Sequence, residues 1–296
     1  MRHFLPLFLF AFTVRSLIAQ DWSAVEIKTT KIADNIYMLE GRGGNIGVSV
    51  GNDGIMIIDD QYAPLADKIK AAIRELSEKE IKYVVNTHWH GDHMGGNEVF
   101  GAEGSIIIAH ENVRTRVSTD QFMEHMQRTV EARPELAWPV VTFSQDLTFY
   151  FNDQEIMIHH GPPAHTDGDA VIYFKKANVV HMGDTFVRYG YPFIDMSAGG
   201  SVNGMIDHLN EVLQVIDDST KVIPGHGDVA TKSDVINFRD VLTDIRDNVQ
   251  QAVEKGKSLD EILSSGLTSK YDAEWNGEFI KTKDFLSFVY EDLTRE

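Results

Sequence analysis

Residues 88–93 have the sequence His-Trp-His-Gly-Asp-His and follow an apolar run. This segment restricts the possible folds and functions of the chain more than any other feature of the sequence. On an extended backbone, His88 and His90 point to the same side, because side chains alternate along a strand. Asp92 and His93 come after a glycine, where the chain can bend. Neutral imidazole is the commonest metal ligand, and a carboxylate can complete a zinc shell. The spacing therefore predicts a loop at a strand end that serves two metal ions.

A polar surface turn with chance histidines is the alternative interpretation of this segment. Three imidazoles and one carboxylate within six residues form a specific ligand pattern, so we favour a metal site. The chain contains no cysteine, so thiolate cannot hold the metal and disulfides are excluded. A shell of histidine and carboxylate leaves zinc, iron and manganese as candidate metals.

Length and charge narrow the classes of function. A chain of 296 residues with 43% hydrophobic content is long enough for one large α/β domain with a sizeable core. The formal net charge of −18 arises from 27 basic residues against 45 acidic ones. Such a surface disfavours nucleic acid and anionic membranes as partners. A small-molecule substrate is the expected partner of the metal loop.

The first residues are typical of a secretory signal peptide, predicted over residues 1–19. Arg2 begins a basic start, residues 4–14 form an apolar run, and Ala19 offers a small residue for cleavage. The run is too short to span a bilayer, so stable membrane insertion is not expected. A buried N-terminal helix or an uncleaved anchor is the alternative. The prediction is an exported protein, periplasmic or secreted, whose mature domain comprises residues 20–296.

Short apolar runs alternate with turns and helical patterns in both halves of the mature chain, which favours one domain built of two similar halves. The predicted strands cover residues 26–39 with a break near 34–35, 46–50, 55–58, 81–85, 105–109, 147–151, 155–160, 170–174, 178–182 and 221–223. The predicted helices cover residues 64–78, 92–100, 110–133, 202–217, 233–255, 258–264 and 278–294. Ser201 is a plausible N-cap. Within residues 120–139, Met123, Met126 and Trp138 are expected to pack in the core rather than cover a cleft.

Three further polar residues stand at the ends of apolar runs. His165 lies in a loop between predicted strands, Asp184 ends a buried strand, and His226 lies between glycines after another strand. Taken singly, each is more often a turn or cap residue than a ligand. Functional groups collect on loops at strand ends of a rigid sheet. Together with the histidine loop, the three residues predict a shared site.

This order of residues resembles the metallo-β-lactamase fold superfamily of metal-dependent hydrolases, over about residues 27–226. The resemblance implies an α/β (α+β) fold, a four-layer αββα sandwich of two mixed β-sheets flanked by helices, with the metal site at one edge. It implies two zinc ions held by two groups of ligands: His88, His90 and His165 for the first, and Asp92, His93 and His226 for the second. Asp184 falls where glyoxalase II and related hydrolases use a bridging aspartate.

The resemblance implies a dizinc-dependent hydrolase that attacks its substrate with a metal-bound hydroxide. Bound zinc lowers the pKa of water from about 16 to about 7, so hydroxide is available at neutral pH. Asp92 is expected to be catalytic, orienting the nucleophile and relaying its proton. The lactamase subclass that uses a cysteine ligand is excluded, and the all-histidine subclass does not usually carry a bridging aspartate. A β-lactam amide, a thioester and an ester or lactone remain open as substrates.

Two other functions compete with hydrolysis. An iron-dependent oxidoreductase on the same fold is one, although the six-ligand set with Asp184 favours a dinuclear hydrolase. A non-catalytic metal-binding protein is the other, and it predicts lost ligands, whereas every motif ligand is present.

The loop after Asp184 supplies candidate substrate contacts. Arg188, Tyr189 and Tyr191 could grip a carboxylate and a planar group, with surface residues as the alternative interpretation. Hydrogen bonds that hold the histidine tautomers are also expected. The candidate partners are Thr87, Thr166, Asp167, Asp169 and, among the remaining histidines, His181.

Overall fold

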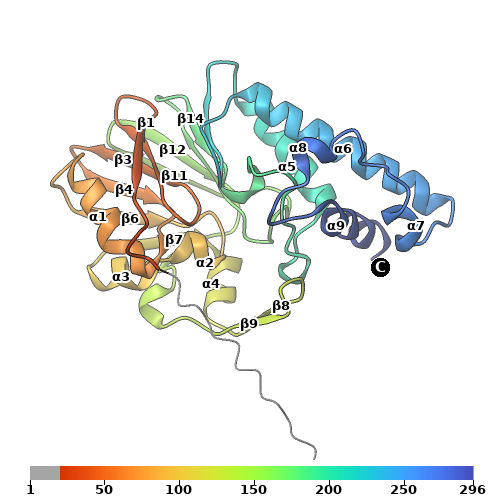
Figure 1. Cartoon of the computed structure of the whole chain (residues 1–296). Helices are drawn as coiled ribbons and strands as arrows, with labels where there is room; N and C mark the ends of the chain where they lie inside the picture. Colours follow the sequence, from red (N-terminus) through yellow and green to blue (C-terminus); the bar gives the residue numbers. More distant parts are fainter. Residues whose placement is uncertain (1–20, 296) are drawn as a thin grey trace, which may run out of the picture.

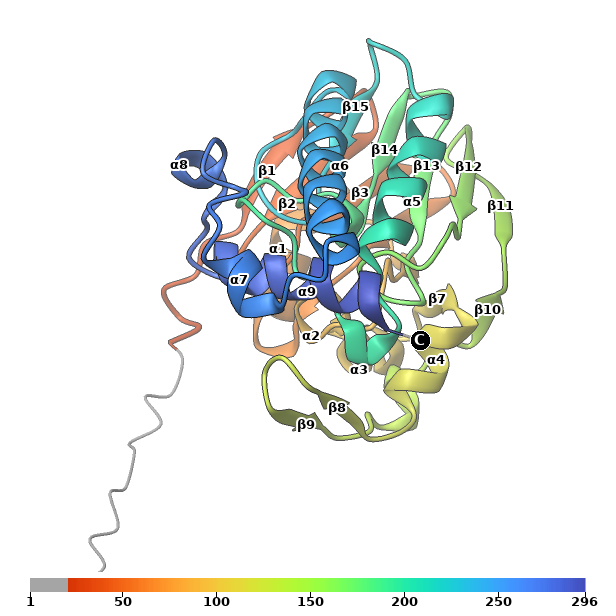
Figure 2. The ribbon, with the colours of Figure 1, turned by 90° about the vertical axis from the view of Figure 1, so that its right-hand side faces the viewer.

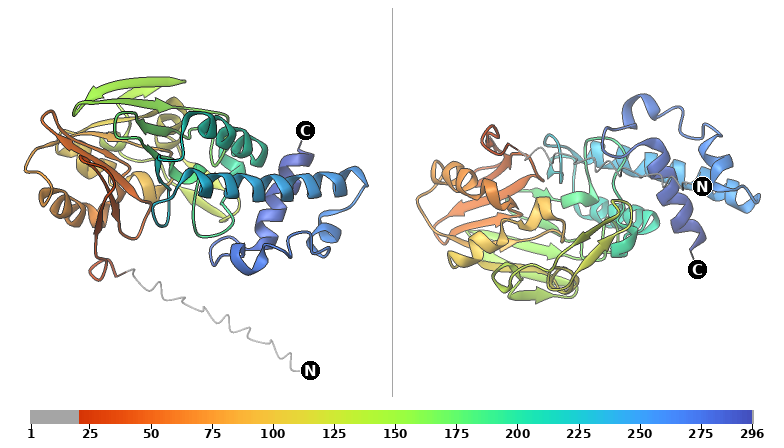
Figure 3. Two further views of the ribbon diagram at one scale, coloured as in Figure 1. Left: turned by 90° about the horizontal axis from the view of Figure 1, so that it is seen from above. Right: turned by 60° about the horizontal axis from the view of Figure 1, so that its bottom comes forward.

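The computed structural model describes residues 21–295, so the predicted signal peptide over residues 1–19 lies outside the described residues. The described chain forms two mixed β-sheets that face each other, with helices on their outer faces (Figures 1 and 3). This arrangement confirms the predicted αββα sandwich. A separate two-stranded hairpin lies apart from both sheets.

The first sheet contains seven strands in the order β1-β2-β3-β4-β6-β7-β10. Their bounds are β1 Lys28–Lys31, β2 Ile36–Glu40, β3 Ile46–Gly51, β4 Gly54–Ile58, β6 Ile81–Val85, β7 Ile106–His110 and β10 Val141–Phe143. Strands β1 to β4 form an antiparallel meander, whereas β4, β6, β7 and β10 run parallel. The predicted turn between β3 and β4 is present, and Gly54 takes a φ of +130° that favours glycine.

Alternation of side chains explains how this sheet is covered. In β4, Ile55 and Ile57 pack with Ile69 of helix α1 (Ala66–Arg74), whereas Met56 and Ile58 belong to the core between the two sheets. A strand buried on both faces reads as a continuous apolar run, as this one does. Helix α3 (Asn97–Ala102) covers the same outer face.

The second sheet contains five strands in the order β11-β12-β13-β14-β15. Their bounds are β11 Asp146–Phe151, β12 Gln154–His159, β13 Val171–Phe174, β14 Val179–His181 and β15 Lys221–Ile223. The helices beside it are α5 Val202–Val215, α6 Lys232–Glu254, α7 Leu259–Leu263, α8 Asp272–Trp275 and α9 Thr282–Thr294. Ser201 caps α5 as predicted, since its Oγ accepts from the Gly204 amide at 3.0 Å. Within residues 21–295, no helix has both the length and the apolar character needed to cross a bilayer.

The core between the sheets joins apolar side chains from both. Ile58, Val85 and Ile108 of the first sheet pack in one cluster with Ile158 and Ile172 of the second, all with no exposed surface. Burying each such side chain contributes about 1.5–3 kcal/mol. The two sheets therefore hold each other in place, and the loops at their shared edge are held with them.

One predicted helix is wrong. Residues 110–133 form the short helix α4 (Glu111–Val117) and then a hairpin of β8 (Gln121–Met123) and β9 (Arg128–Val130), at the bottom of Figure 2. The base of the hairpin is tied by the Asp120 carboxylate, which accepts from the Ala132 amide at 2.8 Å. The predicted core position holds for Met123, which is 3% exposed, but not for Met126, which is 36% exposed. Helical spacing of apolar residues cannot by itself distinguish a helix from a short hairpin with one buried face.

The predicted helix over residues 92–100 is also split in two. Helix α2 (Gly91–Met94) ends before α3 begins, and the two-residue strand β5 (Gln61–Tyr62) forms isolated bridges with Met94 and Gly95 beside it.

Candidate metal centre

The predicted ligands come from loops at one edge of the sandwich. The histidine loop follows β6, Asp184 follows β14, and His226 follows β15. His165 lies in the loop between β12 and β13. Because β14 and β15 run parallel, their carboxyl ends meet at the same edge. The structure thus brings together all seven ligands predicted from the sequence.

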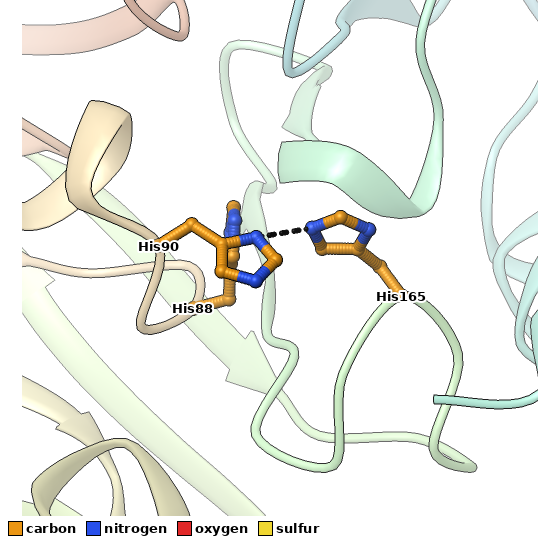
Figure 4. A group of neighbouring side chains, drawn as sticks. All are labelled: His88, His90 and His165. Atoms are coloured by element: carbon orange, nitrogen blue, oxygen red, sulfur yellow. Dashed lines mark hydrogen bonds between the residues drawn. The ribbon is translucent and has the colours of Figure 1, made fainter. Parts of the chain in front are cut away.

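The first group of ligands is His88, His90 and His165 (Figure 4). His90 Nδ1 lies 2.8 Å from His165 Nε2, and all three side chains are buried. The other ring nitrogen of each is held: His90 Nε2 by Asp195 Oδ2 at 2.9 Å, and His165 Nδ1 by the Phe193 carbonyl at 2.7 Å. Each of these two rings therefore directs its N–H away from the other ligands, toward its acceptor oxygen.

These hydrogen bonds indicate which ring nitrogen of each histidine carries the proton. A neutral imidazole has one N–H, so the nitrogens of His90 and His165 that face each other both present lone pairs. His88 follows the same rule, because its Nδ1 donates to Thr87 Oγ1 at 3.0 Å while its buried Nε2 has no partner among the described residues. Converging lone pairs without a shared proton fit a cation, and imidazole nitrogen is a preferred zinc ligand. The side chains therefore fit a bound metal ion.

The second group is Asp92, His93 and His226. His93 Nε2 lies 3.3 Å from His226 Nε2, which lies 3.3 Å from Asp92 Oδ2. The opposite nitrogen of His93 donates to Asp59 Oδ2 at 2.7 Å. Asp92 and His226 are the more exposed members, with 27% and 24% of their side chains accessible.

Asp184 lies between the two groups. Its Oδ1 is 3.1 Å from His93 Nε2 and its Oδ2 is 3.7 Å from His165 Nε2. One carboxylate thus faces both groups of ligands, which is the arrangement expected of a bridging ligand.

Burial and charge set the protonation of the two groups. Burial and the neighbouring histidines hold the pKa of His88 well below its usual value and lower that of His165 to about 4, so both are neutral at pH 7. Burial lowers the pKa of His226 too, but Asp184 and Asp92 outweigh it and raise the value to about 9. The carboxylates therefore favour positive charge at the second group, which protons or a metal ion can supply.

Two residues that support the ligands were missed by sequence reasoning. Asp59 accepts from the Thr87 amide at 2.7 Å, from the Thr87 hydroxyl at 2.8 Å and from His93. It holds a φ of 64°, a strained conformation for a non-glycine residue. Asp59 follows the apolar strand β4, so the strand-end reasoning applied to Asp184 could have found it. Asp195 has no comparable signal, because it lies in an irregular loop.

Of the residues predicted to hold the histidine tautomers, Thr87 contacts a ligand directly, because its hydroxyl accepts from His88. Thr166, Asp167 and His181 contact other residues instead. Thr166 donates to the carboxylate of Asp169 at 2.7 Å and thereby shapes the loop after His165. Asp167 instead pairs with Arg116 at 2.6 Å, and His181 bonds to the Asn45 carbonyl at 3.1 Å.

A cavity of about 680 Å³ opens onto both groups of ligands. Its walls include Trp89, Tyr62, Tyr189, Phe193 and Phe279, with Met123, Met126, Val130, Arg128, Arg133 and Glu278. This volume is ordinary for a small-molecule site. Met126, which was predicted to pack in the core, therefore borders the cleft, and the buried Met123 contributes to the same wall.

Of the three predicted substrate contacts, only Tyr189 lines this cavity. Arg188 pairs with Asp234 at 3.3 Å and lines a different cavity. Tyr191 is fully buried and stacks on Phe285, with ring centroids 4.8 Å apart. The structure thus corrects the expectation for Arg188 and Tyr191 and removes them from the candidate contacts.

Comparisons with known sequences agree with this site. The family model of the metallo-beta-lactamase superfamily matches residues 35–227. A hydroxyacylglutathione hydrolase from Pelagibacter ubique (strain HTCC1062) is 29% identical over 201 residues, which cover 67% of this chain and 72% of that protein. A second, from Polaromonas sp. (strain JS666 / ATCC BAA-500), is 29% identical over 164 residues, which cover 55% of each chain.

Solved structures share the fold at lower identity. A metallo-beta-lactamase from Pontibacter korlensis superposes with a TM-score of 0.61 at 18% identity, over 74% of this chain and 99% of that one. The sec-alkylsulfatase Pisa1 from Pseudomonas sp. superposes with a TM-score of 0.67 at 15% identity, over 90% of this chain and 50% of that one. The family match extends over well more than half of the sequence, so the protein belongs to the metallo-β-lactamase superfamily.

Proposed function

We propose that this protein is a dizinc-dependent hydrolase that cleaves a thioester or ester bond of a small molecule. The observation that carries the proposal is the position of Asp184, whose two oxygens face the two groups of ligands. A bridging carboxylate suits a site with two cations, which act on both the attacking and the leaving atom. Two relatives are named for the hydrolysis of hydroxyacylglutathione, which favours an acyl substrate here as well.

The residues that would hold the two ions are the two groups already described. Zinc is the proposed metal because imidazole and carboxylate suit it, although the same ligand types bind iron and manganese. When bound, the ions would lower the pKa of a water molecule and polarise the carbonyl of the substrate.

Residues of the chain orient the reacting groups. Asp92 is the proposed catalytic residue, because it lines the cavity and His93 and His226 hold its pKa below the usual range in spite of burial. It is therefore a carboxylate at neutral pH, able to accept a hydrogen bond from a nucleophilic water and then its proton. Asp59 and Asp195 fix the rings of His93 and His90, so that ligand nitrogens stay aimed at the site during turnover.

The proposal is tested by hydrolysis assays on the protein loaded with two equivalents of zinc. The substrates are a phenyl thioester, a γ-lactone and a chromogenic cephalosporin, each at several concentrations. We expect turnover of the thioester or the lactone, abolished in His90→Ala. His159→Ala is the matched control, since this histidine pairs with Asp146 and Glu211 away from the metal centre. Turnover of the cephalosporin alone would replace the proposed substrate class with β-lactams, and no turnover of any substrate would refute hydrolysis.

A further inference from the structure

Two arginines in the wall of the cavity have no acidic partner in the described part of the chain. Arg128 and Arg133 both line it, and neither has a carboxylate within 4.0 Å among residues 21–295. The chain has a net charge of −18, so acidic partners are plentiful elsewhere. Arg116, Arg188, Arg239, Arg246 and Arg295 are each paired with a carboxylate, whereas, within residues 21–295, Arg42, Arg74 and Arg114 are not. Arg128 and Arg133 are distinguished because both line the cavity at the metal centre. An uncompensated pair of guanidinium groups facing a cavity indicates an anionic occupant.

Arg133 is held close to the metal loop. Its amide donates to the Val117 carbonyl at 2.7 Å, and its own carbonyl accepts from Trp138 Nε1 at 2.8 Å. Its Nη2 lies 3.2 Å from the point where a Cβ at position 91 would stand, so the guanidinium covers Gly91, next to Asp92. These two contacts fix the backbone from which the Arg133 side chain extends over the metal loop.

Arg128 reaches the same cavity from strand β9. Its Nη2 lies 3.8 Å from Met123 Sδ of the facing strand. Burial raises the pKa of Tyr62 to about 12 and Asp92 adds to that effect, whereas the charge of Arg128 opposes it. The charge of Arg128 therefore acts on Tyr62, another residue of the cavity wall.

The remaining wall is mainly apolar. Trp89, Phe193 and Phe279 line it together with Met123 and Met126 of the hairpin. Apart from the metal ligands, the charged side chains that line the cavity are Glu278, Arg128 and Arg133, so their net charge is positive. The cavity thus complements a molecule that joins an apolar part to a negative charge.

We propose that Arg128 and Arg133 form an anion subsite that selects substrates carrying a carboxylate beside an apolar group. This inference rests on the proposed hydrolase function and specifies its substrate class. The planar fork of guanidinium donors matches a carboxylate in two parallel hydrogen bonds. At long range the negative field of the protein repels anions, so binding an anionic substrate requires a local cationic site.

The test compares substrates that differ only in charge. One pair is the S-acetyl thioesters of 3-mercaptobenzoate and 3-mercaptobenzamide, and the other is the phenyl thioesters of glutaric acid and of its monoamide. We expect kcat/KM to favour the carboxylate in at least one pair by about tenfold or more, the factor expected for a charge-assisted contact. The preference, taken as the ratio of kcat/KM for the charged and the neutral member of a pair, should fall in Arg128→Gln and in Arg133→Gln and vanish in the double variant. Arg74→Gln, which removes a charge from a different cavity, should retain it.

A binding measurement separates this inference from the hydrolase proposal. Calorimetry on the zinc-free protein compares 1-naphthoate with 1-naphthamide, so no metal can coordinate the carboxylate. We expect the naphthoate to bind about tenfold more tightly, and this difference to be lost in the double variant, whose urea midpoint checks that it is folded. Equal hydrolysis within both pairs, or an unchanged binding preference in the folded double variant, would overturn the anion subsite and leave hydrolysis standing. Naphthoate selectivity without hydrolysis of any thioester would uphold the subsite and refute the proposed reaction.

Discussion

Replacing Asp195 by asparagine tests the tautomer argument most directly. Oδ2 of Asp195 accepts from His90 Nε2, while Oδ1 accepts from Ser197 Oγ at 2.6 Å and from the Ala198 amide at 3.1 Å. An asparagine has one acceptor oxygen, and the two donors at Oδ1 favour placing it there. Its NH₂ group would then face His90 Nε2, which must become an acceptor and shift its proton to Nδ1. That proton would occupy the lone pair that His90 presents to the metal site.

The expected loss follows from this change. Removing the carboxylate partner of a metal-ligating histidine lowers metal affinity by about 10- to 100-fold, equivalent to about 1.4–2.8 kcal/mol. The measurement is a zinc titration in competition with a chromogenic chelator, for wild type and Asp195→Asn. Asp146→Asn is the matched control, because Asp146 accepts from His159 at 2.6 Å away from the metal centre. A folded Asp195→Asn protein that binds zinc within twofold of wild type would refute the tautomer assignment.

Three further outcomes are expected. Burial lowers the pKa of His208 to about 4, so the folded chain keeps it neutral while the unfolded chain binds a proton below its usual value near 6.5. The free energy of unfolding should therefore fall between pH 6.5 and pH 4, by up to about 3 kcal/mol. If urea melts of His208→Gln show the same fall, His208 is not its origin. Ile172→Ala should cost about 2–5 kcal/mol in urea unfolding, because the side chain is fully buried between the sheets, and a cost below about 1 kcal/mol would contradict its place in the core. We also propose that the protein is exported and cleaved after Ala19, so mass spectrometry of the mature chain should give a mass that begins at Gln20, and a mass that retains residues 1–19 would refute this cleavage.

Most strands were predictable because their side chains follow a simple period. The turn between β3 and β4 and the runs that became β6 and β13 lie where the apolar pattern placed them. The hairpin of β8 and β9 was not predictable in this way. Its strands are three residues each, too short for a period to distinguish them from one turn of helix. The Asp120 contact at its base joins residues on either side of the hairpin and is visible only in the folded chain.

The sequence by itself determined the ligand chemistry, because metal binding requires particular side chains, and histidine and aspartate at the ends of apolar runs are visible in the order of residues. Only the tertiary structure decided what supports and surrounds those ligands. Asp195 lies 105 residues from the histidine that it holds, and the hairpin arginines share a cavity with ligands from four other loops. Such contacts depend on how the two sheets pack, since packing brings together side chains that carry no common local pattern. The ligands are thus a local property of the chain, whereas tautomer control and substrate selection arise from the fold.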